Sequence, residues 1–594
     1  METQEIKNFD STTRNVWRLL FIMGMSACMH SVAQEPVPTD IRVNQVGYYP
    51  REKKIAVVVG EGRKDFYIET VPGSRQVFQG VLSAAVQSTF SSRKSQVADF
   101  SSLTDTGTYV LIVPGLGKSW PFEIRHNVLA EAARASLKAF YFQRFSTALA
   151  PGFAGKWSRP FCHPDDRVLI HASAADDKRR EGTVIASPRG WMDAGDYNKY
   201  VVNSGISTAT LLSAYEDYGT HYRSLNLVIP ESSNTLPDIL DETLWNLRWM
   251  LTMQDPNDGG VYHKCTNANF DPMVMPDRAT TPRYVVRKST AAALNLAAVC
   301  AQAARVFRMF DKELPGLADS CLVAAQRAWQ WARSHPDERY EQEKINAQFD
   351  PDITTGAYGD SDVSDEFVWA ACELTATTGD NAYVKSVSLI NEEPLRVPSW
   401  NQVKLLGYYT LVRHEEKLKG VLKNEIPTVR ERLVGKANEM ITGVEKREFR
   451  TVMGGNLRDF VWGSNAVAAN QAILLLTAFK ISGNRAFYEY AIGQADYLLG
   501  RNATGYSFLT GYGDRTPMHP HHRPSEADGV ADPVPGLLAG GPNPGMQDKC
   551  KYPSSVPDEA YVDDACSYAS NEIAINWNAP CAYLLGALEA LQAR

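Results

Sequence analysis

Two carboxylates set three residues apart form the part of this chain best suited to chemistry. Asp193 and Asp196 lie in the segment 190–200 and are separated by an Ala-Gly pair. Gly195 allows a sharp backbone turn, so both acids can point toward one spot rather than to opposite sides of an extended strand. Trp191 and Tyr197 beside them suit the C–H faces of a sugar ring, whose hydroxyls the carboxylates would take. An Asp-rich turn that merely caps a helix is the structural alternative, and the motif alone leaves both interpretations open.

A second group of carboxylates lies near the far end of the chain. Glu572 precedes an apolar, helix-like run over 573–591, with Ser570 and Asn571 as candidate caps. Because a helix N-terminus lowers the pKa of a carboxyl, a glutamate acting there as an acid needs burial or nearby like charge to offset it. The same segment offers candidates for that charge and that burial: Asp563, Asp564, Tyr568 and Trp577.

Three histidines in four residues precede this second group. His519, His521 and His522 suggest a metal site, but Pro520 interrupts them and no nearby cysteine completes a set with zinc spacing. Arg523 would also repel a cation. We therefore interpret these histidines as hydrogen-bond donors to a polar substrate.

The elements that must position these residues fall into two regimes. From about residue 37 to 126 the chain has short β-branched runs separated by Gly, Pro and Ser turns, typical of a small sandwich. From residue 128 onward apolar residues recur at helical spacing, which predicts helix-on-helix packing in one large domain. The expected strands are 55–59, 65–69, 97–100 and 107–113. The expected helices are 129–149, 204–218, 238–253, 289–307, 317–332, 365–377, 400–414, 429–443, 464–481, 485–499 and 570–593.

The first residues resemble a targeting segment. The apolar run 19–28 follows two arginines and is too short to cross a bilayer as a stable anchor, and a small-x-small site ends at Ala33. A loose lipoprotein box ending at Cys28 is the rival interpretation. We favour cleavage after Ala33, because Met25 is a poor first residue for such a box. Both interpretations export the protein, and no later stretch is expected to be long and apolar enough to span a membrane.

Charge and cysteine content exclude some classes of protein. A net charge of −7 gives no reason to invoke nucleic acid or an anionic membrane surface. Nine cysteines in 594 residues are too few for a disulfide scaffold, and a chain of this length buries an ample core without one. Cys550 and Cys566 lie in a loop-rich stretch and are candidates for pairing, which spacing alone does not establish.

Three segments together resemble the signature regions of glycoside hydrolase family 9, the inverting cellulases. The segment 521–523 resembles the first signature, 561–579 the second, and 193–196 the family's Asp-Ala-Gly-Asp. The stretch 41–48 resembles the start of the immunoglobulin-like domain that precedes many such catalytic modules. The resemblance implies a mainly α protein, with an (α/α)6 barrel after a small all-β immunoglobulin-like sandwich. The expected division is a signal peptide over 1–33, the sandwich over 36–126 and the catalytic domain over 127–594.

The resemblance also implies catalytic roles. Glu572 is expected to protonate the leaving oxygen as general acid, and Asp196 to activate water as general base. Asp193 would share the nucleophilic water or hold Asp196 in place, and Asp563 would orient and polarise the surroundings of the acid. His521, counted with this catalytic group, would bind a hydroxyl of the sugar at the cleavage point.

Substrate-binding residues are expected around these acids. Arg523 would bind sugar hydroxyls, and the stacking candidates are Trp191, Tyr197, Trp462, Tyr568 and Trp577. Core packing is the commoner role of a tryptophan in a helical domain, and Trp191 is the expected exception because it adjoins the acids. The implied substrate is a β-1,4-glucan, namely cellulose-like, mixed-linkage or xyloglucan backbones, cleaved by an endo-acting monomer.

No cofactor is expected for the chemistry, while structural calcium is common in the family. The acidic loops 255–258 and 359–362 offer hard oxygen ligands, although solvated turns are the simpler interpretation. The alternative functions are an exo-acting β-glucosidase or glucosaminidase of the same fold, a helical-toroid polysaccharide lyase, or a non-catalytic glycan-binding protein. A lyase would leave the paired acids unexplained, and retention of both acid and base argues against a binding protein.

Overall fold

The computed structural model describes residues 40–593, so the expected signal peptide over 1–33 and Cys28 lie outside the described residues. Short β-branched runs form nine strands between Ile41 and Ile124. One sheet has the order β1-β3-β6 and the other β2-β9-β7-β4-β5, with β8 paired to β7, and their inner faces enclose a core of residues such as Phe66, Leu111 and Phe122. The strands are β1 Ile41–Arg42, β2 Gly47–Tyr48, β3 Ile55–Val59, β4 Asp65–Thr70, β5 Gln76–Val81, β6 Ser95–Asp99, β7 Gly107–Val113, β8 Gly117–Lys118 and β9 Phe122–Ile124. The expected sandwich is confirmed.

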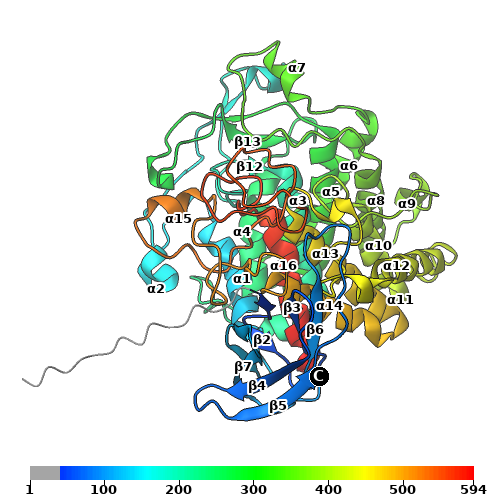
Figure 1. Cartoon of the computed structure of the whole chain (residues 1–594). Coiled ribbons are helices and arrows are strands. Elements are labelled where there is room, and N and C mark those ends of the chain that lie inside the picture. Colours follow the sequence, from blue (N-terminus) through cyan, green and yellow to red (C-terminus); the bar gives the residue numbers. More distant parts are fainter. Residues whose placement is uncertain (1–39, 594) are drawn as a thin grey trace, which may run out of the picture. The chain divides into compact units, whose positions relative to one another are not determined.

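The rest of the chain is mainly helical, and its long helices form an (α/α)6 barrel (Figure 1). The helices α16, α3, α5, α8 and α10 pack on one another in that order, and α13 packs on α16. Others pack outside them: α1 on α16, α4 on α3, α6 on α5 and α14 on α13. The bounds are α1 Ala130–Phe142, α3 Val201–Ser224, α4 Asp238–Thr252, α5 Thr290–Phe307, α6 Leu317–Ser334, α8 Ser364–Thr378, α10 Lys404–Arg413, α12 Glu425–Ile441, α13 Ser464–Ser482, α14 Arg485–Leu498 and α16 Ile575–Gln592. Shorter helices are α2 Pro151–Ala154, α7 Gln342–Asn346, α9 Ala382–Lys385, α11 Glu415–Leu418 and α15 Arg523–Ala527.

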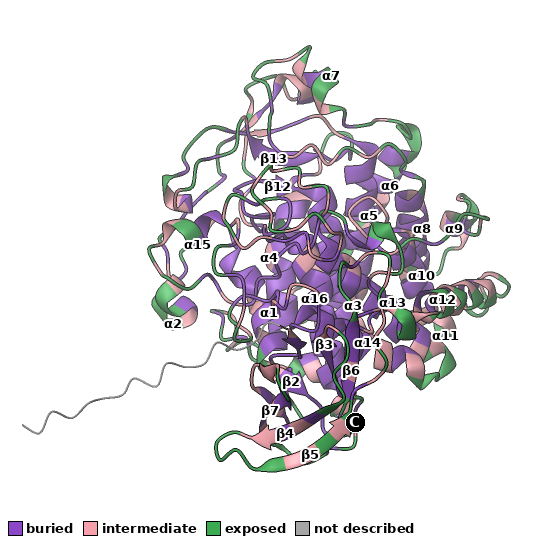
Figure 2. Cartoon of the chain, viewed as in Figure 1, coloured by how far each residue is buried: buried purple, intermediate pink, exposed green. Residues whose placement is uncertain are grey.

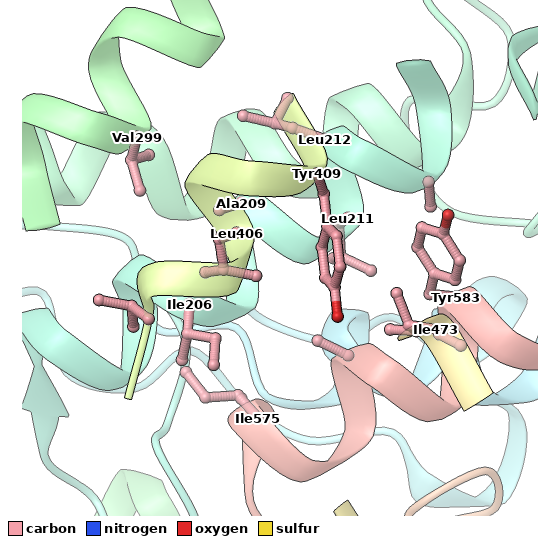
Figure 3. Close-up of a cluster of buried hydrophobic side chains, with 14 of the residues drawn as sticks. Ile206, Ala209, Leu211, Leu212, Val299, Leu406, Tyr409, Ile473, Ile575 and Tyr583 are labelled. Atoms are coloured by element: carbon pink, nitrogen blue, oxygen red, sulfur yellow. The ribbon is translucent and has the colours of Figure 1, made fainter. Parts of the chain in front are cut away.

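The inner helices are buried almost around their full circumference. Figure 3 shows side chains such as Ile206, Leu406, Ile473 and Ile575, from four different helices, gathered in one apolar cluster. Figure 2 shows α3 and α16 coloured as buried nearly throughout, whereas α12 keeps an exposed face. Helices that are apolar on all sides in this way must lie inside the protein.

One helical segment corrects the expectation that no later stretch is apolar enough to span a membrane. Thr290–Phe310, which is α5 continued by one 3-10 turn, meets the length and composition for a span. Its most apolar window is 94% buried within the protein, because α3, α6 and α8 pack around it. This segment is accordingly a core helix of the barrel.

A small sheet that the sequence pattern did not predict lies beside the helices. Its order is β11-β10-β14-β13-β12, with bounds β10 Val168–Ile170, β11 Val184–Ile185, β12 Lys199–Tyr200, β13 Lys264–Asn267 and β14 Arg283–Val285. Each strand has two to four residues, too few for periodicity to reveal. Because β12 pairs with β13 and leads directly into α3, the C-terminal end of the segment before Lys199 is held in place.

Two predicted helices end differently from the sequence pattern. The helix expected over 129–149 ends at Phe142, where the chain turns and Arg144 pairs with Trp191. The helix expected from 570 begins at Ile575, capped by Ala574 without a side-chain hydrogen bond. Ser570 is therefore not a cap. In both cases hydrogen bonds to distant segments replace the helical ones.

The β-sandwich is hydrogen-bonded to the last turn of α14 and to the loop that follows it. Asn44 donates to the Asp496 carboxylate at 2.8 Å, and the Gln45 side-chain oxygen accepts the backbone N–H groups of Asp514 and Arg515. This loop leads directly to the histidine segment at 519–522. The first strands thus help to fix the entry of a candidate site segment.

Candidate active site

Close approach, rather than an unusual backbone angle, explains the glycine in the Asp-Ala-Gly-Asp turn. A Cβ on Gly195 would lie 2.0 Å from the backbone oxygen of His521, and the backbone of Gly195 is outside the left-handed region. The chain bends over residues 194–197 as expected, but the structural reason for glycine at position 195 is this close approach. Only a residue without a side chain lets the turn touch the histidine segment.

Asp193 is buried with both carboxylate oxygens occupied. The amide of Asn203 donates to both of them at 3.0 Å, and the Tyr358 hydroxyl donates to Oδ2 at 3.1 Å. Burial and the neighbouring charge of Asp196 raise the pKa of Asp193 well above its usual range. A carboxyl whose two oxygens are both already hydrogen-bonded is suited to positioning rather than to taking a proton from water.

Asp196 has one oxygen held and one oxygen free. Oδ2 accepts hydrogen bonds from the Asn198 amide at 2.6 Å and the Tyr200 hydroxyl at 3.0 Å. Oδ1 is buried and finds no hydrogen-bond partner among the described residues. A buried carboxylate oxygen without a partner is costly and calls for a ligand or water. The geometry therefore provides an oxygen that can accept a proton.

Glu572 lies in extended backbone three residues before α16 and faces the same turn. Its backbone runs beside that of His521, and the backbone N–H of Gly195 bonds its carboxyl. Burial, and then the charges of Asp196 and Asp193, raise the pKa of Glu572 well above its usual range, although Arg523 opposes them. A carboxyl whose pKa is raised in this way keeps its proton to higher pH than an ordinary glutamate, which is the property a general acid needs.

The charge that raises the pKa of Glu572 is not the one expected from the sequence. Asp563 and Asp564 were the expected sources, but the structure gives this role to the Asp-Ala-Gly-Asp turn. Helix α16 begins after Glu572, so the expected opposing effect of its N-terminus also falls away. The sequence alone did not predict this, because almost 400 residues separate the turn at 193–196 from Glu572.

Among the described residues, Asp563 forms hydrogen bonds with those next to the acid and not with Glu572 itself. Its carboxylate accepts the backbone N–H groups of Met518 and His519 at 2.8 and 2.9 Å. It also accepts the side-chain amide of Asn571 at 3.1 Å, while the Tyr561 hydroxyl donates to the Asn571 oxygen. Asp563 thus ties the histidine segment to the residue that precedes Glu572. Asn571 is a positioning residue that its expected role as a helix cap did not reveal.

The three histidines point in different directions. His519 is exposed and lies 3.7 Å from Glu526. His522 is buried between Ser525 and Gln143, and the Gln143 amide donates in turn to the backbone oxygen of Ala194. Among the described residues no group of three or more His, Cys, Asp or Glu side chains could hold a metal ion.

His521 is partly buried and neutral near pH 7. Its Nδ1 lies 2.6 Å from the backbone oxygen of Ala565, so Nδ1 carries the proton and donates. Burial lowers the pKa of His521, so Nε2 keeps a lone pair. We expected a donor to the substrate, whereas this tautomer makes Nε2 an acceptor for a sugar hydroxyl.

Arg523 is buried against the catalytic turn. It donates through a terminal nitrogen to the backbone oxygen of Gly195 at 2.7 Å and through Nε to that of Asp271 at 2.8 Å. Its guanidinium also lies 5.8 Å from the ring of Phe270, which is 47% exposed. Two of its three nitrogens are thus used to hold the turn, with the third left for a substrate.

Two of the expected stacking residues lie in the core, so those predictions are wrong. Trp191 is fully buried, donates to Glu242 at 2.8 Å and packs on Phe140. Tyr197 is also fully buried and donates to the backbone oxygen of Val274 at 2.6 Å. Neither ring is exposed to a sugar, because each is enclosed by core residues and its polar group is already hydrogen-bonded within the protein.

Other aromatic residues do reach the surface beside the acid. Trp462 is 43% exposed and its ring centre lies 5.4 Å from that of Tyr568, which in turn packs edge-on against His521. Trp577 is partly buried. On the side of Asp193, Tyr358 packs on Trp400, which is also partly exposed. The sequence analysis assigned no role to Tyr358 or Trp400, because the contact of Tyr358 with Asp193 joins segments far apart in the chain.

The two loops considered for calcium differ in their surroundings. Asp255 and Asp258 are already paired with Lys288, at 2.8 and 2.9 Å, so a cation is provided by the chain and the prediction for that loop is wrong. In the other loop Asp360 meets Glu366 at the start of α8. Oδ2 of Asp360 and both carboxylate oxygens of Glu366 are buried, and among the described residues Glu366 shares its hydrogen bonding with the carboxyls of Asp360 and Asp365. Burial raises the pKa of Asp360 and Glu366.

Taken together, the site offers a carboxyl with a raised pKa at Glu572 and, in the turn that faces it, a carboxylate oxygen of Asp196 free to accept a proton. That pair can cleave an acetal by protonating the leaving oxygen and activating water. Neutral His521 and the free Arg523 nitrogen supply an acceptor and a donor for hydroxyl groups.

Comparison with known proteins agrees with this chemistry. The family model described as glycosyl hydrolase family 9 matches residues 130–585, and that of the cellulase N-terminal ig-like domain matches 37–118. A xyloglucan-specific endo-β-1,4-glucanase of Bacteroides ovatus is 43% identical over 93% of this chain and 94% of its own. Endoglucanase D of Acetivibrio thermocellus is 32% identical over 92% of this chain and 82% of its own. The solved structure titled Bacteroides ovatus GH9 superposes with a TM-score of 0.89 at 41% identity, covering 93% of this chain and 99% of that one.

Proposed function

Since the chain belongs to glycosyl hydrolase family 9, we propose that Glu572 and Asp196 are the general acid and general base of its reaction. The protein is an endo-acting β-1,4-glucan hydrolase. The observation that carries the assignment is the contrast within the turn: Asp196 keeps a free oxygen, whereas both oxygens of Asp193 are occupied.

In the proposed reaction the glucan lies with the oxygen of its scissile bond beside Glu572. Glu572 gives that oxygen a proton as the bond breaks, and Asp196 takes a proton from a water that attacks the anomeric carbon from the opposite face. Asp193 holds the turn through Asn203 and Tyr358. His521 and Arg523 bind hydroxyls of the distorted sugar, and contacts that strengthen in the transition state lower the barrier.

Stereochemistry tests this mechanism. Inversion requires the carboxyls of Asp196 and Glu572 to lie roughly 6.5–9.5 Å apart with room for water, whereas about 5 Å would mean retention. We expect hydrolysis of a β-1,4-glucan oligosaccharide to release the α-anomer first, measured by proton NMR in the first minutes of reaction. Initial release of the β-anomer would contradict the assignment of Asp196 as base.

We further propose xyloglucan as the preferred glucan, since the Bacteroides ovatus relative is named for that substrate. Trp462 and Tyr568 would form an exposed platform for the sugar chain next to the acid. A panel of xyloglucan, mixed-linkage glucan and carboxymethyl cellulose with product sizing tests this. Endo action gives a rapid fall in chain length, whereas release of single sugars would favour the exo-acting alternative. Unsaturated chain ends would indicate a lyase.

Export and domain division remain part of the proposal. The segment 1–33 would direct export and be cleaved after Ala33, unless Cys28 is lipidated. Residues 36–126 would be the immunoglobulin-like domain and 127–594 the catalytic domain of a monomer. Size-exclusion chromatography and mass spectrometry of the mature N-terminus test these statements.

A structural calcium ion is proposed between Asp360 and Glu366. These buried carboxyls lie in one cluster with Asp365, and their oxygens are hard ligands of the kind calcium takes, together with backbone carbonyls and water. When bound, calcium would offset the repulsion of these buried charges and tie the loop 359–362 to α8.

The calcium proposal predicts a stability change. Calcium at one hundred times its Kd should raise the free energy of unfolding by about 2.7 kcal/mol, and a chelator should reverse this. Differential scanning calorimetry with and without calcium measures the shift in Tm. Glu366→Gln should lose the response, whereas Asp258→Asn, in the loop already neutralised by Lys288, should keep it. An equal response in both variants would place the ion elsewhere.

A further inference from the structure

His521 contacts a long segment, residues 541–571, that contains no helix or strand. Between Gly541 and Asn571 the chain has only turns and bends, and many of its side chains are exposed. Such segments keep their shape through side-chain hydrogen bonds or covalent links rather than through a core. Two such restraints are present in this one.

The first restraint is Asp548. Its carboxylate accepts the backbone N–H groups of Cys550 and Ala569 at 3.0 and 2.9 Å. It also accepts the hydroxyls of Tyr552 and Ser567, each at 2.8 Å. The start and the end of the segment are thereby drawn to one side chain.

The second restraint is the disulfide between Cys550 and Cys566, which joins residues 16 apart in the sequence. Its pairing answers the question that spacing left open. Cys566 directly follows Ala565, whose backbone oxygen is the acceptor of the His521 Nδ1 proton. Two residues beyond Cys566, Tyr568 packs against both His521 and Trp462. The covalent link is thus one residue from the contact that sets the histidine tautomer.

We propose that the Cys550–Cys566 disulfide is a positioning element for His521. By fixing the turn 563–568 it holds the Ala565 carbonyl on Nδ1, so that Nε2 stays an acceptor for a sugar hydroxyl at the cleavage point. This inference rests on the proposed function, because it assigns the substrate contact of that same site. Loss of the disulfide would free the turn, and His521 would then sample both neutral tautomers and the protonated form. Only the tautomer with its proton on Nδ1 leaves Nε2 able to accept a hydrogen bond from the sugar hydroxyl.

The electrostatic surroundings favour the neutral acceptor in the linked state. The charged groups that face His521 are Arg523, Asp196 and Asp548, with His522 beside it. Burial lowers the pKa of His521 most, the Ala565 hydrogen bond and the two aspartates raise it, and Arg523 lowers it. If the turn opens and burial is lost, the pKa should return toward about 6.5. Protonation would then remove the acceptor within the working pH range.

Kinetics of Cys566→Ser, Cys550→Ser and His521→Ala, singly and combined, test the proposal. We expect each serine variant to lower kcat/KM on a soluble β-1,4-glucan by about tenfold and to add an acidic limb near pH 6.5 to its pH profile. In the His521→Ala background the same substitutions should cost less than twofold, because residues that act as a unit are not additive. Dithiothreitol should reproduce the loss in the wild-type protein and leave the double serine variant unchanged, since the other described cysteines are free and buried.

The same set of variants distinguishes a loss of protein stability from a loss of the His521 position. Assays are run well below the Tm of each variant, measured by calorimetry. Additive losses, or a pH profile with no new limb, would show that the disulfide does not act through His521. A wild-type protein that hydrolyses no β-1,4-glucan would instead overturn the proposed function, so the two failures are distinct. Serine variants with wild-type kcat/KM would refute the proposal directly.

Discussion

Glu572→Gln is expected to lower kcat on β-1,4-glucan polymers by about 10²- to 10⁴-fold. The amide keeps the shape and most hydrogen bonds of the side chain but has no proton to give to the leaving oxygen. Aryl glycosides with good leaving groups need less acid assistance and should lose much less. Steady-state kinetics on both substrate classes measure the difference, and equal losses on both would contradict the role of Glu572 as the acid.

The pH profile gives a second measurement on the same variant. Glu572 must be protonated to act, so activity falls as pH rises through its pKa. Because burial and the two aspartates raise that pKa, the wild-type protein should stay active to higher pH than an ordinary glutamate would allow. In Glu572→Gln this alkaline limb should vanish. Glu343→Gln, on the exposed face of α7, is the matched control and should leave both rate and profile unchanged.

Asp196→Ala is expected to abolish hydrolysis of polymers and aryl glycosides alike. A good leaving group replaces the acid but cannot replace an activated water, so losses of about 10²- to 10⁴-fold should appear on both substrates. Added azide should restore part of the rate on aryl glycosides as an external nucleophile, with inversion at the anomeric carbon. Product analysis by NMR identifies the glycosyl azide.

Asp193→Ala is the internal comparison for this prediction. Since the carboxyl of Asp193 is fully engaged by Asn203 and Tyr358, its loss should disturb the turn and reduce the rate less than loss of Asp196, without rescue by azide. If Asp193→Ala is the inactive variant and Asp196→Ala is not, the two roles are exchanged. Activity in both variants would mean that the Asp-Ala-Gly-Asp segment is a structural turn.

Local sequence patterns were sufficient to predict many of the strands and helices. The strands at 55–59 and 107–113 are found where alternation and β-branched residues placed them, since their cores are formed by neighbouring strands of the same sandwich. Long helices such as α4 and α6 were also found within two residues at each end. The two-residue strand β12 was missed, because its only support is the distant strand β13.

The sequence by itself determined which residues could perform the chemistry: two aspartates in one turn, a glutamate before the last helix, and a histidine and an arginine together. Only the tertiary structure decided which of these residues is suited to which role in the reaction. Tyr358, 165 residues from Asp193, occupies the oxygen that would otherwise compete with Asp196 as base. Trp191 is buried in the core, where its indole N–H donates to Glu242. In the loop at 255–258, Lys288 forms the ion pair that a bound cation would otherwise form. Such outcomes depend on burial and charge contributed by segments far apart in the chain, and these quantities exist only once the barrel has brought the segments together.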